Sequence, residues 1–513
     1  MDSRLSAVRL YGAVAACALV WYVGTLWNHF AFDDNQIVQF NKLVLQISGV
    51  WRAFVSPYWP PMVGGGLYRP LPLASYVIDW QLGGAAWWFH AVNVAWHAGV
   101  SVALAWLARR WSGERAALAA GLLFAVHPVH VEAVANIVGR AELMAALFVI
   151  LSVYAALVRD RVWWCAAALA AGLLSKENAV VAPALIAWGW LLQLAPRPAW
   201  RRVAAYAAVW LALGTAYGVV RWSVLGAEVT SGITLAPVFF HAPPVAVRLT
   251  ALAALADVAR LLVYPLTLRV DYSPAERTLV PTPLDPRFAL GLLCVAAWGV
   301  LVWLTWRRWR GRRVEAFGLG WIAIALLPVS NLVFPVGVLL AERALYLPSA
   351  GLALAAGAWL KDLEPRRFAL VLGLLVVAGG VRSAVRVPVW RDTRSMIMSE
   401  LEDSPRSFFG PAHMVVFYLN GHQPAKALEA FRAATAITDV TLSWLYVTGA
   451  EAAFETGHAA LADSILTRLE SVCRPCDFLY RYEAPLARAR GYSVAADSFA
   501  ARIGRAPHPV NDR

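Results

Sequence analysis

The chain has 513 residues, of which 60% are hydrophobic and only 15% are charged, and its mean hydropathy is +0.57. A soluble protein of this length needs far more polar surface, so the composition excludes that class and predicts a polytopic membrane protein. Lys and Arg number 45 against 32 Asp and Glu. In a membrane protein such an excess is typical of cytoplasmic loops facing anionic lipid, and it does not indicate nucleic-acid binding.

The first predicted helix covers residues 11–27, which are almost wholly apolar and long enough to cross a bilayer with their flanks. No small-residue cleavage site with a soluble domain behind it follows, so we expect this helix to be retained. Asp33 and Asp34 come next, among aromatic residues, in a loop from residue 28 to about 88. Carboxylates at a membrane surface border a low-dielectric region, where their pKa is easily tuned. A solvated acidic loop is the alternative interpretation.

Basic clusters predict the topology, because cytoplasmic loops are rich in Lys and Arg. Five clusters alternate with apolar runs: 109–115, 159–161, 197–202, 307–313 and 361–367. Placing them inside puts the loop 28–88 and the C-terminal tail outside. The apolar run 249–267 disturbs the alternation. It is either re-entrant or surface-lying, or residues 233–247 add a short crossing, and both possibilities stay open.

The tail, residues 386–513, has a lower apolar density and amphipathic helical patterns. Gly421, Gly457 and Gly491 recur at spacings of 36 and 34 residues, and each precedes a small residue, at Ala427, Ala462 and Ala496. A turn glycine and a packing alanine at this period indicate tetratricopeptide-like helix pairs, which stack around a concave surface. An ordinary helical bundle is the alternative. The tail also carries Cys473 and Cys476, which form a weak zinc signal or, outside the cell, a local disulfide.

Under this topology many polar and ionisable residues share the outer face. They are Asp33, Asp34, Arg69, His90, His127, His130, Glu132, Arg140, Glu142, Lys176, Glu177, Asp271, Tyr272, Glu342, Arg343 and Tyr346. Such a gathering at one membrane face suggests a reaction site there.

Histidines within this set allow other interpretations. His90, Asn93 and His97 fall at i, i+3 and i+7, so they form one polar helix face, for which helix–helix hydrogen bonding is an alternative to substrate contact. His127 and His130 with the nearby Glu132 could suggest a metal site. Pro128 interrupts the helix there and no fixed ligand spacing emerges, so we predict no metal site, although a divalent metal requirement stays open.

Several blocks of the sequence, in this order, resemble the TMTC family of transmembrane and tetratricopeptide-repeat-containing protein O-mannosyltransferases. The blocks are 32–34, 68–71, 89–93 with His97, 124–134, 138–142, 175–177, 271–273 and 341–349. The resemblance covers about residues 10–440. It implies a GT-C glycosyltransferase fold of about 10–12 transmembrane helices, a polyprenyl-phosphate sugar (mannose in that family) as co-substrate, and a hydroxyl acceptor such as protein Ser or Thr. The tail is shorter than in the family, and the Ala- and Arg-rich composition indicates a bacterial inner-membrane protein.

Sugar transfer from a lipid phosphate to a hydroxyl needs a base for the hydroxyl proton and cations around the departing phosphate. The resemblance implies Asp33 as the base, with Asp34 orienting it or the acceptor. Arg69, Lys176 and Arg343 are the predicted phosphate-binding residues, and pairing with acids of the same face is their alternative role. Further substrate-site candidates are His90, His127, His130, Glu132, Arg140, Glu177, Asp271, Tyr272, Glu342 and Tyr346.

The sequence therefore predicts an all-α inverting glycosyltransferase, with a membrane domain over 1–385 and an extracytoplasmic helical-repeat tail over 386–513. Its expected partners are the sugar lipid, a polypeptide or other hydroxyl acceptor, and membrane lipids. A transporter or lipid flippase is one alternative, but such proteins bury ionisable residues in mid-span and contain repeated halves, which we do not see. A membrane-anchored repeat scaffold would leave the acids and histidines of the membrane part unexplained.

Overall fold

The structure is a computed structural model and describes residues 2–60, 66–226, 237–239, 242–272, 275–309, 311–438, 441–473 and 476–504. The described residues form helices and contain no strand, so the predicted all-α class is confirmed. Contacts divide the chain into two compact units, which lie within residues 1–235, 242–268 and 279–396, and within 236–241, 269–278 and 397–513. The predicted boundary after residue 385 stays a prediction.

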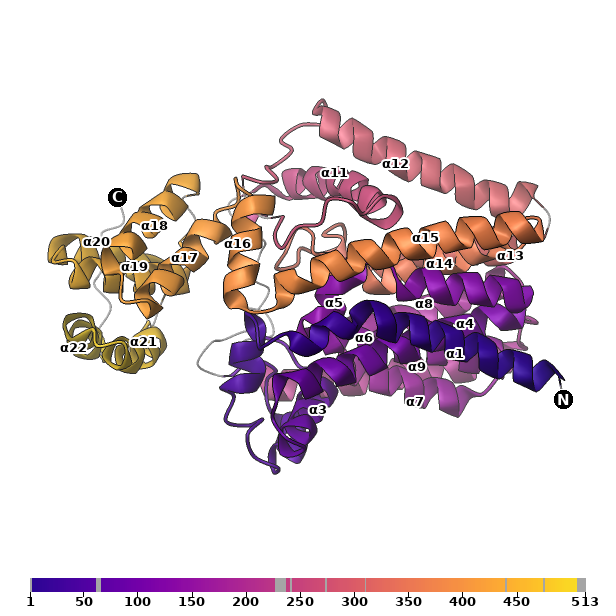
Figure 1. Ribbon diagram of the computed structural model, residues 1–513, viewed down its shortest axis with the longest axis horizontal. Helices are drawn as coiled ribbons and strands as arrows, with labels where there is room; N and C mark the ends of the chain where they lie inside the picture. The colour runs from indigo at the N-terminus through magenta and orange to yellow at the C-terminus, as the bar shows by residue number, and fades with distance from the viewer. Residues whose placement is uncertain are drawn as a thin grey trace. The chain divides into compact units, whose positions relative to one another are not determined.

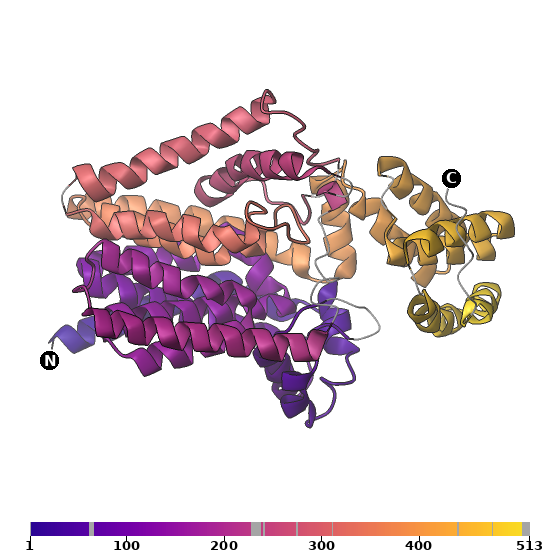
Figure 2. The ribbon, with the colours of Figure 1, turned by 180° about the vertical axis from the view of Figure 1, so that it is seen from behind.

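The first unit is a bundle of long helices, which Figures 1 and 2 show from its two sides. Its helices are α1 (Asp2–Tyr22), α2 (Gly49–Arg52), α3 (Pro70–Gln81), α4 (Ala86–Ala125), α5 (Val131–Ala135), α6 (Arg140–Leu157), α7 (Val162–Ser175), α8 (Ala182–Leu191), α9 (Trp200–Leu225), α11 (Pro244–Val263), α12 (Pro286–Trp303), α13 (Arg313–Leu326), α14 (Tyr346–Leu360) and α15 (Pro365–Arg386). In its core α4 packs against α1, α6 and α14, and α13 packs against α14. Short one-turn 3₁₀ segments, such as Ile137–Gly139 and Glu342–Leu345, connect these helices.

Local sequence explains where several helices begin. Pro70, Pro286 and Pro365 stand at the first position of α3, α12 and α15, where a missing N–H costs nothing and the fixed φ favours the helix. Asp285 caps α12 by accepting a hydrogen bond from the Arg287 N–H. Apolar helix formers then continue each run, so these helices need packing or lipid around them rather than water.

Six segments among the described residues are long and apolar enough to cross a membrane. They are Ala7–Trp27, Ala86–Ala125, Ile137–Leu157, Trp200–Leu225, Pro286–Arg308 and Pro365–Trp390. The chain is an integral, multi-pass membrane protein. Its 40-residue helix α4 is broken at Gly113, where φ is 81°. A 40-residue helix would extend about 60 Å, twice the thickness of the hydrocarbon core, and the break lies within the basic cluster 109–115 that the sequence predicts to be a loop.

The six candidate spans are identified by length and composition alone. The predicted total of about 10–12 spans therefore stays a prediction. In the ambiguous region, the apolar run 249–267 lies largely within α11. Residues 233–236 and 240–241 of the possible extra crossing lie outside the described residues, as does Ser273 of the block 271–273.

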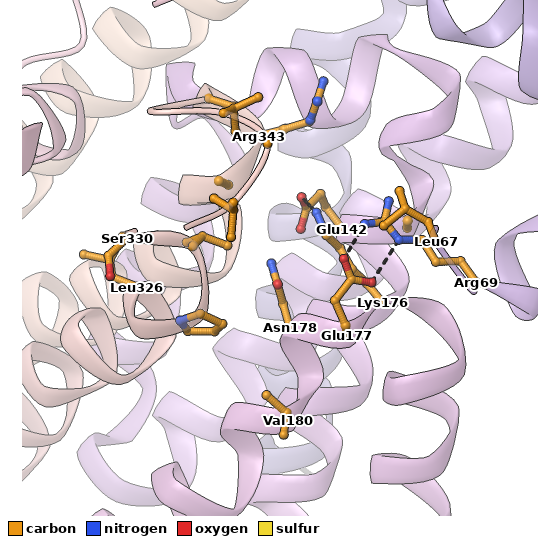
Figure 3. A pocket seen from close by; sticks show the side chains of 18 of the residues that line it. Leu67, Arg69, Glu142, Lys176, Glu177, Asn178, Val180, Leu326, Ser330 and Arg343 are labelled. Carbon is orange, nitrogen blue, oxygen red and sulfur yellow. Dashed lines mark hydrogen bonds and ion pairs between the residues drawn. The ribbon is translucent and has the colours of Figure 1, made fainter. Parts of the chain in front are cut away.

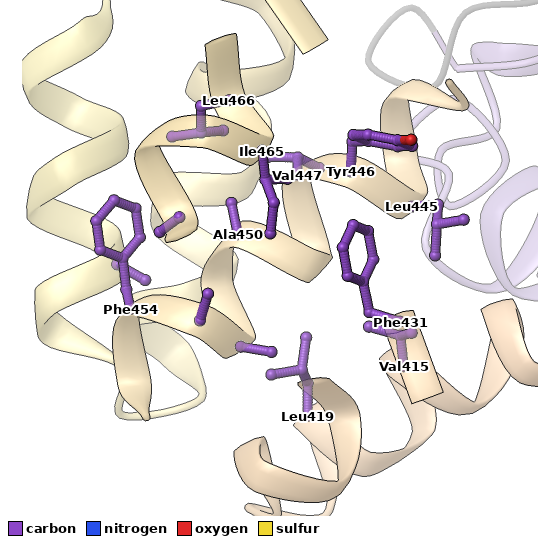
Figure 4. Close-up of a cluster of buried hydrophobic side chains, with 14 of the residues drawn as sticks. Val415, Leu419, Phe431, Leu445, Tyr446, Val447, Ala450, Phe454, Ile465 and Leu466 are labelled. Atoms are coloured by element: carbon purple, nitrogen blue, oxygen red, sulfur yellow. The ribbon is translucent and has the colours of Figure 1, made fainter. Parts of the chain in front are cut away.

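The second unit contains six consecutive helices after α16 (Thr393–Asp403), which begins before it. They are α17 (Phe409–Asn420), α18 (Pro424–Ile437), α19 (Ser443–Glu455), α20 (Ala459–Val472), α21 (Asp477–Ala489) and α22 (Ser493–Arg502), and they pack as the pairs α17–α18, α19–α20 and α21–α22. Figure 4 shows the apolar core between them. The predicted small packing residues Ala427, Ala462 and Ala496 are fully buried in this core.

In each of the last two helix pairs, a turn glycine lies between the two helices. Gly457 and Gly491 have φ values of 77° and 84°, a left-handed conformation that favours glycine after a helix. Cys473 and Cys476 are thiols rather than a disulfide in the structure, and the Cys476 Sγ donates to the Cys473 carbonyl oxygen at 2.5 Å.

Candidate active site

A cavity of about 820 Å³ opens in the first unit. Its wall combines the loop before α3, the start of α6, the turn after α7, and parts of α9, α11 and the segment 326–345. The polar lining residues are Asp33, Tyr58, Arg69, Glu142, Lys176, Glu177, Asn178, Ser330, Tyr217, Arg221 and Arg343. Figure 3 shows Arg69, Glu142, Lys176 and Glu177 gathered together, with apolar Val180 and Leu326 lying away from them. The cavity therefore offers both a charged pocket and apolar wall.

The two neighbouring acids face different surroundings. Asp33 lines the cavity, whereas Asp34 is fully buried and accepts hydrogen bonds from three backbone N–H groups. These donors are Val138 at 2.9 Å, Ala31 at 3.2 Å and Ile137 at 3.3 Å. Asp34 thus fastens the loop that carries Asp33 to the segment before α6.

Burial controls the ionisation of Asp34. Removal from water raises the pKa of this carboxyl to about 7, although its three backbone donors act in the opposite direction. The turn before it is unusual, because Phe32 has a φ of 52°, a left-handed conformation that a bulky residue rarely adopts. The Thr393 hydroxyl stabilises this turn by accepting from the Phe32 N–H at 2.9 Å.

Arg69 and Glu177 form a two-pronged ion pair inside the cavity wall. Arg69 Nε donates to Glu177 Oε2 at 3.1 Å, and Nη2 donates to Oε1 at 2.6 Å. Burial alone would raise the pKa of Glu177, but the guanidinium outweighs it and the pKa falls to about 2. The guanidinium carbon of Arg69 also lies 5.4 Å from the centre of the Tyr58 ring, so Arg69 is held from two sides.

The other two predicted cations are also paired with acids. Lys176 Nζ donates to Glu142, and burial lowers the pKa of Lys176 although the carboxylate opposes this. Arg343 donates to Glu132 twice, from Nη1 to Oε1 and from its backbone N–H to Oε2, both at 2.8 Å. All three cations line the cavity, and each also makes the ion pair that was its alternative role.

Several predicted site residues do not line this cavity. Arg140 is fully buried, and its guanidinium donates to Asn93 at 2.8 Å, to Ser75 at 3.0 Å and to Asp79 at 2.5 Å. It also lies 4.8 Å from the Tyr76 ring centre. Arg140 therefore fastens α6 to α3 and α4.

The histidines and Tyr346 join helices in the same way. His97 contacts the Tyr346 hydroxyl at 2.8 Å, His130 contacts the Ser349 hydroxyl at 2.7 Å, and His127 contacts the Leu262 carbonyl at 2.9 Å. His90 contacts the carbonyl of residue 29 at 3.3 Å. The contact of His97 with Tyr346 joins α4 to α14, which is the kind of helix–helix hydrogen bond considered as the alternative for the face of His90, Asn93 and His97, whereas His90 contacts a loop carbonyl. Glu342 is buried outside the cavity lining.

Asp271 and Tyr272 belong to the second unit. The Ser407 hydroxyl donates to Asp271 Oδ2 at 2.5 Å, and the Ser404 hydroxyl donates to the Asp271 carbonyl at 2.8 Å. Both contacts lie inside that unit and fasten the segment around Asp271 to the residues after α16.

Five polar lining residues were missed from the sequence, namely Tyr58, Asn178, Tyr217, Arg221 and Ser330. Tyr58 stands in the long loop 28–88 without a recognisable motif, and Tyr217 and Arg221 lie near the end of the apolar helix α9. The only sequence signal for Arg221 is its single charge near the end of an apolar run. Among the described residues, no group of three His, Cys, Asp or Glu side chains is placed to hold a metal ion.

No family model matches the chain. It is 28% identical to human "Protein O-mannosyl-transferase TMTC4" over 458 residues, which cover 76% of this chain and 61% of that protein. The resemblance to the TMTC family is confirmed. Human TMTC3 is 26% identical over 77% of this chain and 47% of its own length. Drosophila melanogaster Tmtc2 is 38% identical over 189 residues, or 32% of this chain and 20% of its own. The chain thus spans at most about three fifths of these relatives.

A solved structure of ArnT from Cupriavidus metallidurans bound to undecaprenyl phosphate aligns with 97% of this chain and 75% of its own. The TM-score is 0.42 and the sequence identity is 15%.

Proposed function

We propose that this protein is a GT-C-type glycosyltransferase that moves a sugar from a polyprenyl phosphate to an acceptor hydroxyl. One observation supports this most: Asp33 and the cations Arg69, Lys176 and Arg343 line one cavity that also has an apolar wall. A lipid-linked sugar phosphate requires these features together, namely a base, positive charge and room for an isoprenoid chain. The similarity to proteins named protein O-mannosyl-transferases supports mannose as the sugar and a protein Ser or Thr as the acceptor.

In the proposed reaction, Asp33 accepts the proton of the acceptor hydroxyl as its oxygen attacks the anomeric carbon. The bond between that carbon and the phosphate oxygen breaks, and its electron pair stays on the departing polyprenyl phosphate. Attack from the face opposite the phosphate inverts the anomeric configuration. The surrounding cations stabilise the negative charge on the leaving phosphate.

Asp34 has a separate role in this proposal. Its three backbone hydrogen bonds hold the loop of Asp33 against the start of α6. This geometry gives the base a fixed position relative to Lys176, whose partner Glu142 stands on α6. Precise placement of a base matters because small displacements of reacting groups are costly in rate.

The remaining parts of the proposal concern location and acceptor. We place the active site and tail on the extracytoplasmic side of a bacterial inner membrane, from the alternation of basic loops. The tail's helix pairs would hold an extended acceptor chain near the site and raise its effective concentration.

The test uses purified full-length protein in lipid nanodiscs with a polyprenyl-phosphate mannose labelled in the sugar, together with a Ser- and Thr-containing peptide. We expect labelled peptide and an equal amount of released polyprenyl phosphate, with inverted anomeric configuration. Failure to release polyprenyl phosphate with any of several sugar donors would overturn the proposal. Movement of intact donor across the bilayer without cleavage would support a flippase instead.

A further inference from the structure

The cavity contains a fourth cation, Arg221 on α9, that the sequence motifs do not include. Its surroundings differ from those of the other three. Arg69, Lys176 and Arg343 each pair with one carboxylate, Glu177, Glu142 and Glu132 respectively. Each of these pairs is formally neutral. Three cations of the cavity are therefore already compensated before any anion enters.

Arg221 has no carboxylate partner among the described residues. Its Nη2 donates to the Gly66 backbone carbonyl at 3.1 Å, which satisfies one donor without neutralising the charge. Its Nε–H is buried and has no hydrogen-bond partner in the described part of the chain. Buried donors are normally satisfied by protein or water, so an unmet donor on a charged side chain that lines a cavity marks where a ligand completes the site.

Neighbouring contacts fix where Arg221 stands. Tyr217, one helical turn earlier on α9, donates its hydroxyl to the Tyr68 carbonyl at 3.4 Å. The two side chains thus hold alternate carbonyls of the segment that leads into Arg69. Arg221 is therefore fixed beside the segment carrying Arg69, and both line the same cavity.

We infer that Arg221 is the principal anchor for the phosphate of the lipid donor in this cavity. This inference rests on the proposed function and names a binding residue within the same site. A guanidinium is suited to the role because it remains charged and presents several N–H groups to phosphate oxygens. The paired cations Arg69, Lys176 and Arg343 then stabilise the charge that develops as the sugar departs, rather than capturing the donor.

The experiment measures binding of two matched probes, farnesyl phosphate and farnesol, to the full-length protein in nanodiscs. The wild type should bind farnesyl phosphate more tightly than farnesol. Arg221→Gln should weaken binding of farnesyl phosphate about tenfold or more and leave farnesol binding unchanged. Arg221→Lys keeps the positive charge but lacks the planar guanidinium, so it should retain part of the preference for farnesyl phosphate over farnesol.

Two control variants separate charge from structure. Tyr217→Phe removes a hydroxyl that bonds the same segment and the Arg221 side chain but removes no charge, so the preference for farnesyl phosphate over farnesol should remain. Arg202→Gln changes an exposed arginine at the other end of α9, which pairs with Asp160, and should change neither. If Arg221→Gln does not fold, Arg221→Lys carries the test through its phosphate-specific loss.

Two results would overturn the inference in distinguishable ways. If the wild type prefers farnesyl phosphate but the Arg221 variants keep that preference, Arg221 is a structural tether and the proposed function stands. If the wild type shows no preference for the phosphate, the lipid-phosphate donor itself is wrong.

Discussion

Glu177 accepts two hydrogen bonds from one edge of the Arg69 guanidinium, at 3.1 Å and 2.6 Å. This leaves the Nη1 side of the fork, which makes no hydrogen bond to the described residues, for other partners. The ion pair therefore has two effects: it neutralises the charge of Arg69, and it orients the guanidinium toward the cavity. The side chains are only 12% and 31% exposed, so their attraction is screened less than that of a surface pair.

A double-mutant cycle of Arg69→Gln and Glu177→Gln should reveal this coupling. We expect the free energies of unfolding to be non-additive by about 0.5–3 kcal/mol, as for residues in direct contact. The more exposed pair Arg109–Glu114, at 2.8 Å, is the matched control and should couple by about 0.2–1 kcal/mol. Equal coupling for the two pairs would mean that the cavity pair is no better organised than a surface one.

Asp34 should make stability depend on pH between about 4 and 7. Burial raises the pKa of this carboxyl from its ordinary 3.8 to about 7, so in this range the folded state binds the proton more tightly than the unfolded state. The free energy of unfolding therefore falls as pH rises through the window and levels off above it. Unfolding of wild type and Asp34→Asn at several pH values checks this. A difference in unfolding free energy between the two proteins that stays constant from pH 4 to 7 would contradict the raised pKa of Asp34.

Much of this arrangement was accessible from the sequence, for identifiable reasons. Apolar runs predict membrane spans because the lipid core favours apolar side chains, and basic clusters predict the loops between the spans. The break at Gly113 falls inside the predicted loop at 109–115. Asp33, Arg69, Lys176 and Arg343 were selected because they stand in the sequence blocks that resemble the TMTC family. The structure brings them to one cavity.

Other parts depend on long-range contacts that no local pattern encodes. Arg140 stands in a motif beside charged neighbours, but its partners Asn93 and Asp79 are 47 and 61 residues away. Asp271 bonds to Ser407, 136 residues later. Arg221 belongs to no recognisable motif, and only its surroundings in the fold indicate that it lines the cavity.

Arg140 should be a stability residue. It is fully buried and its partner Asp79 is 7% exposed at the side chain. Replacing it with Met leaves a buried carboxylate without its cation, which typically costs about 3–5 kcal/mol. Thermal unfolding of Arg140→Met, and of the double variant that adds Asp79→Asn, measures this. The second change should restore part of the loss; no restoration would mean that packing around Arg140, rather than charge pairing, determines the cost.

Deleting residues 405–513 should distinguish acceptors by size. The tail holds no residue of the cavity lining, so reaction with a short peptide at high concentration should be spared. Transfer to a long unfolded polypeptide should fall much more, because the tail no longer raises its effective concentration. Initial rates with both acceptors decide the matter, and equal losses would contradict the acceptor-holding role.

The proposed function depends most on Asp33 as the base and on Asp34 as its positioning neighbour. The most direct measurement is the single-turnover rate of sugar transfer by wild type, Asp33→Asn and Asp34→Asn, each at saturating sugar lipid. An amide is nearly isosteric but accepts no proton at neutral pH, so Asp33→Asn should slow transfer by about two to four orders of magnitude while the protein stays folded. Asp34→Asn should slow it less. Wild-type turnover by Asp33→Asn, or a larger loss from Asp34→Asn, would contradict the assignment.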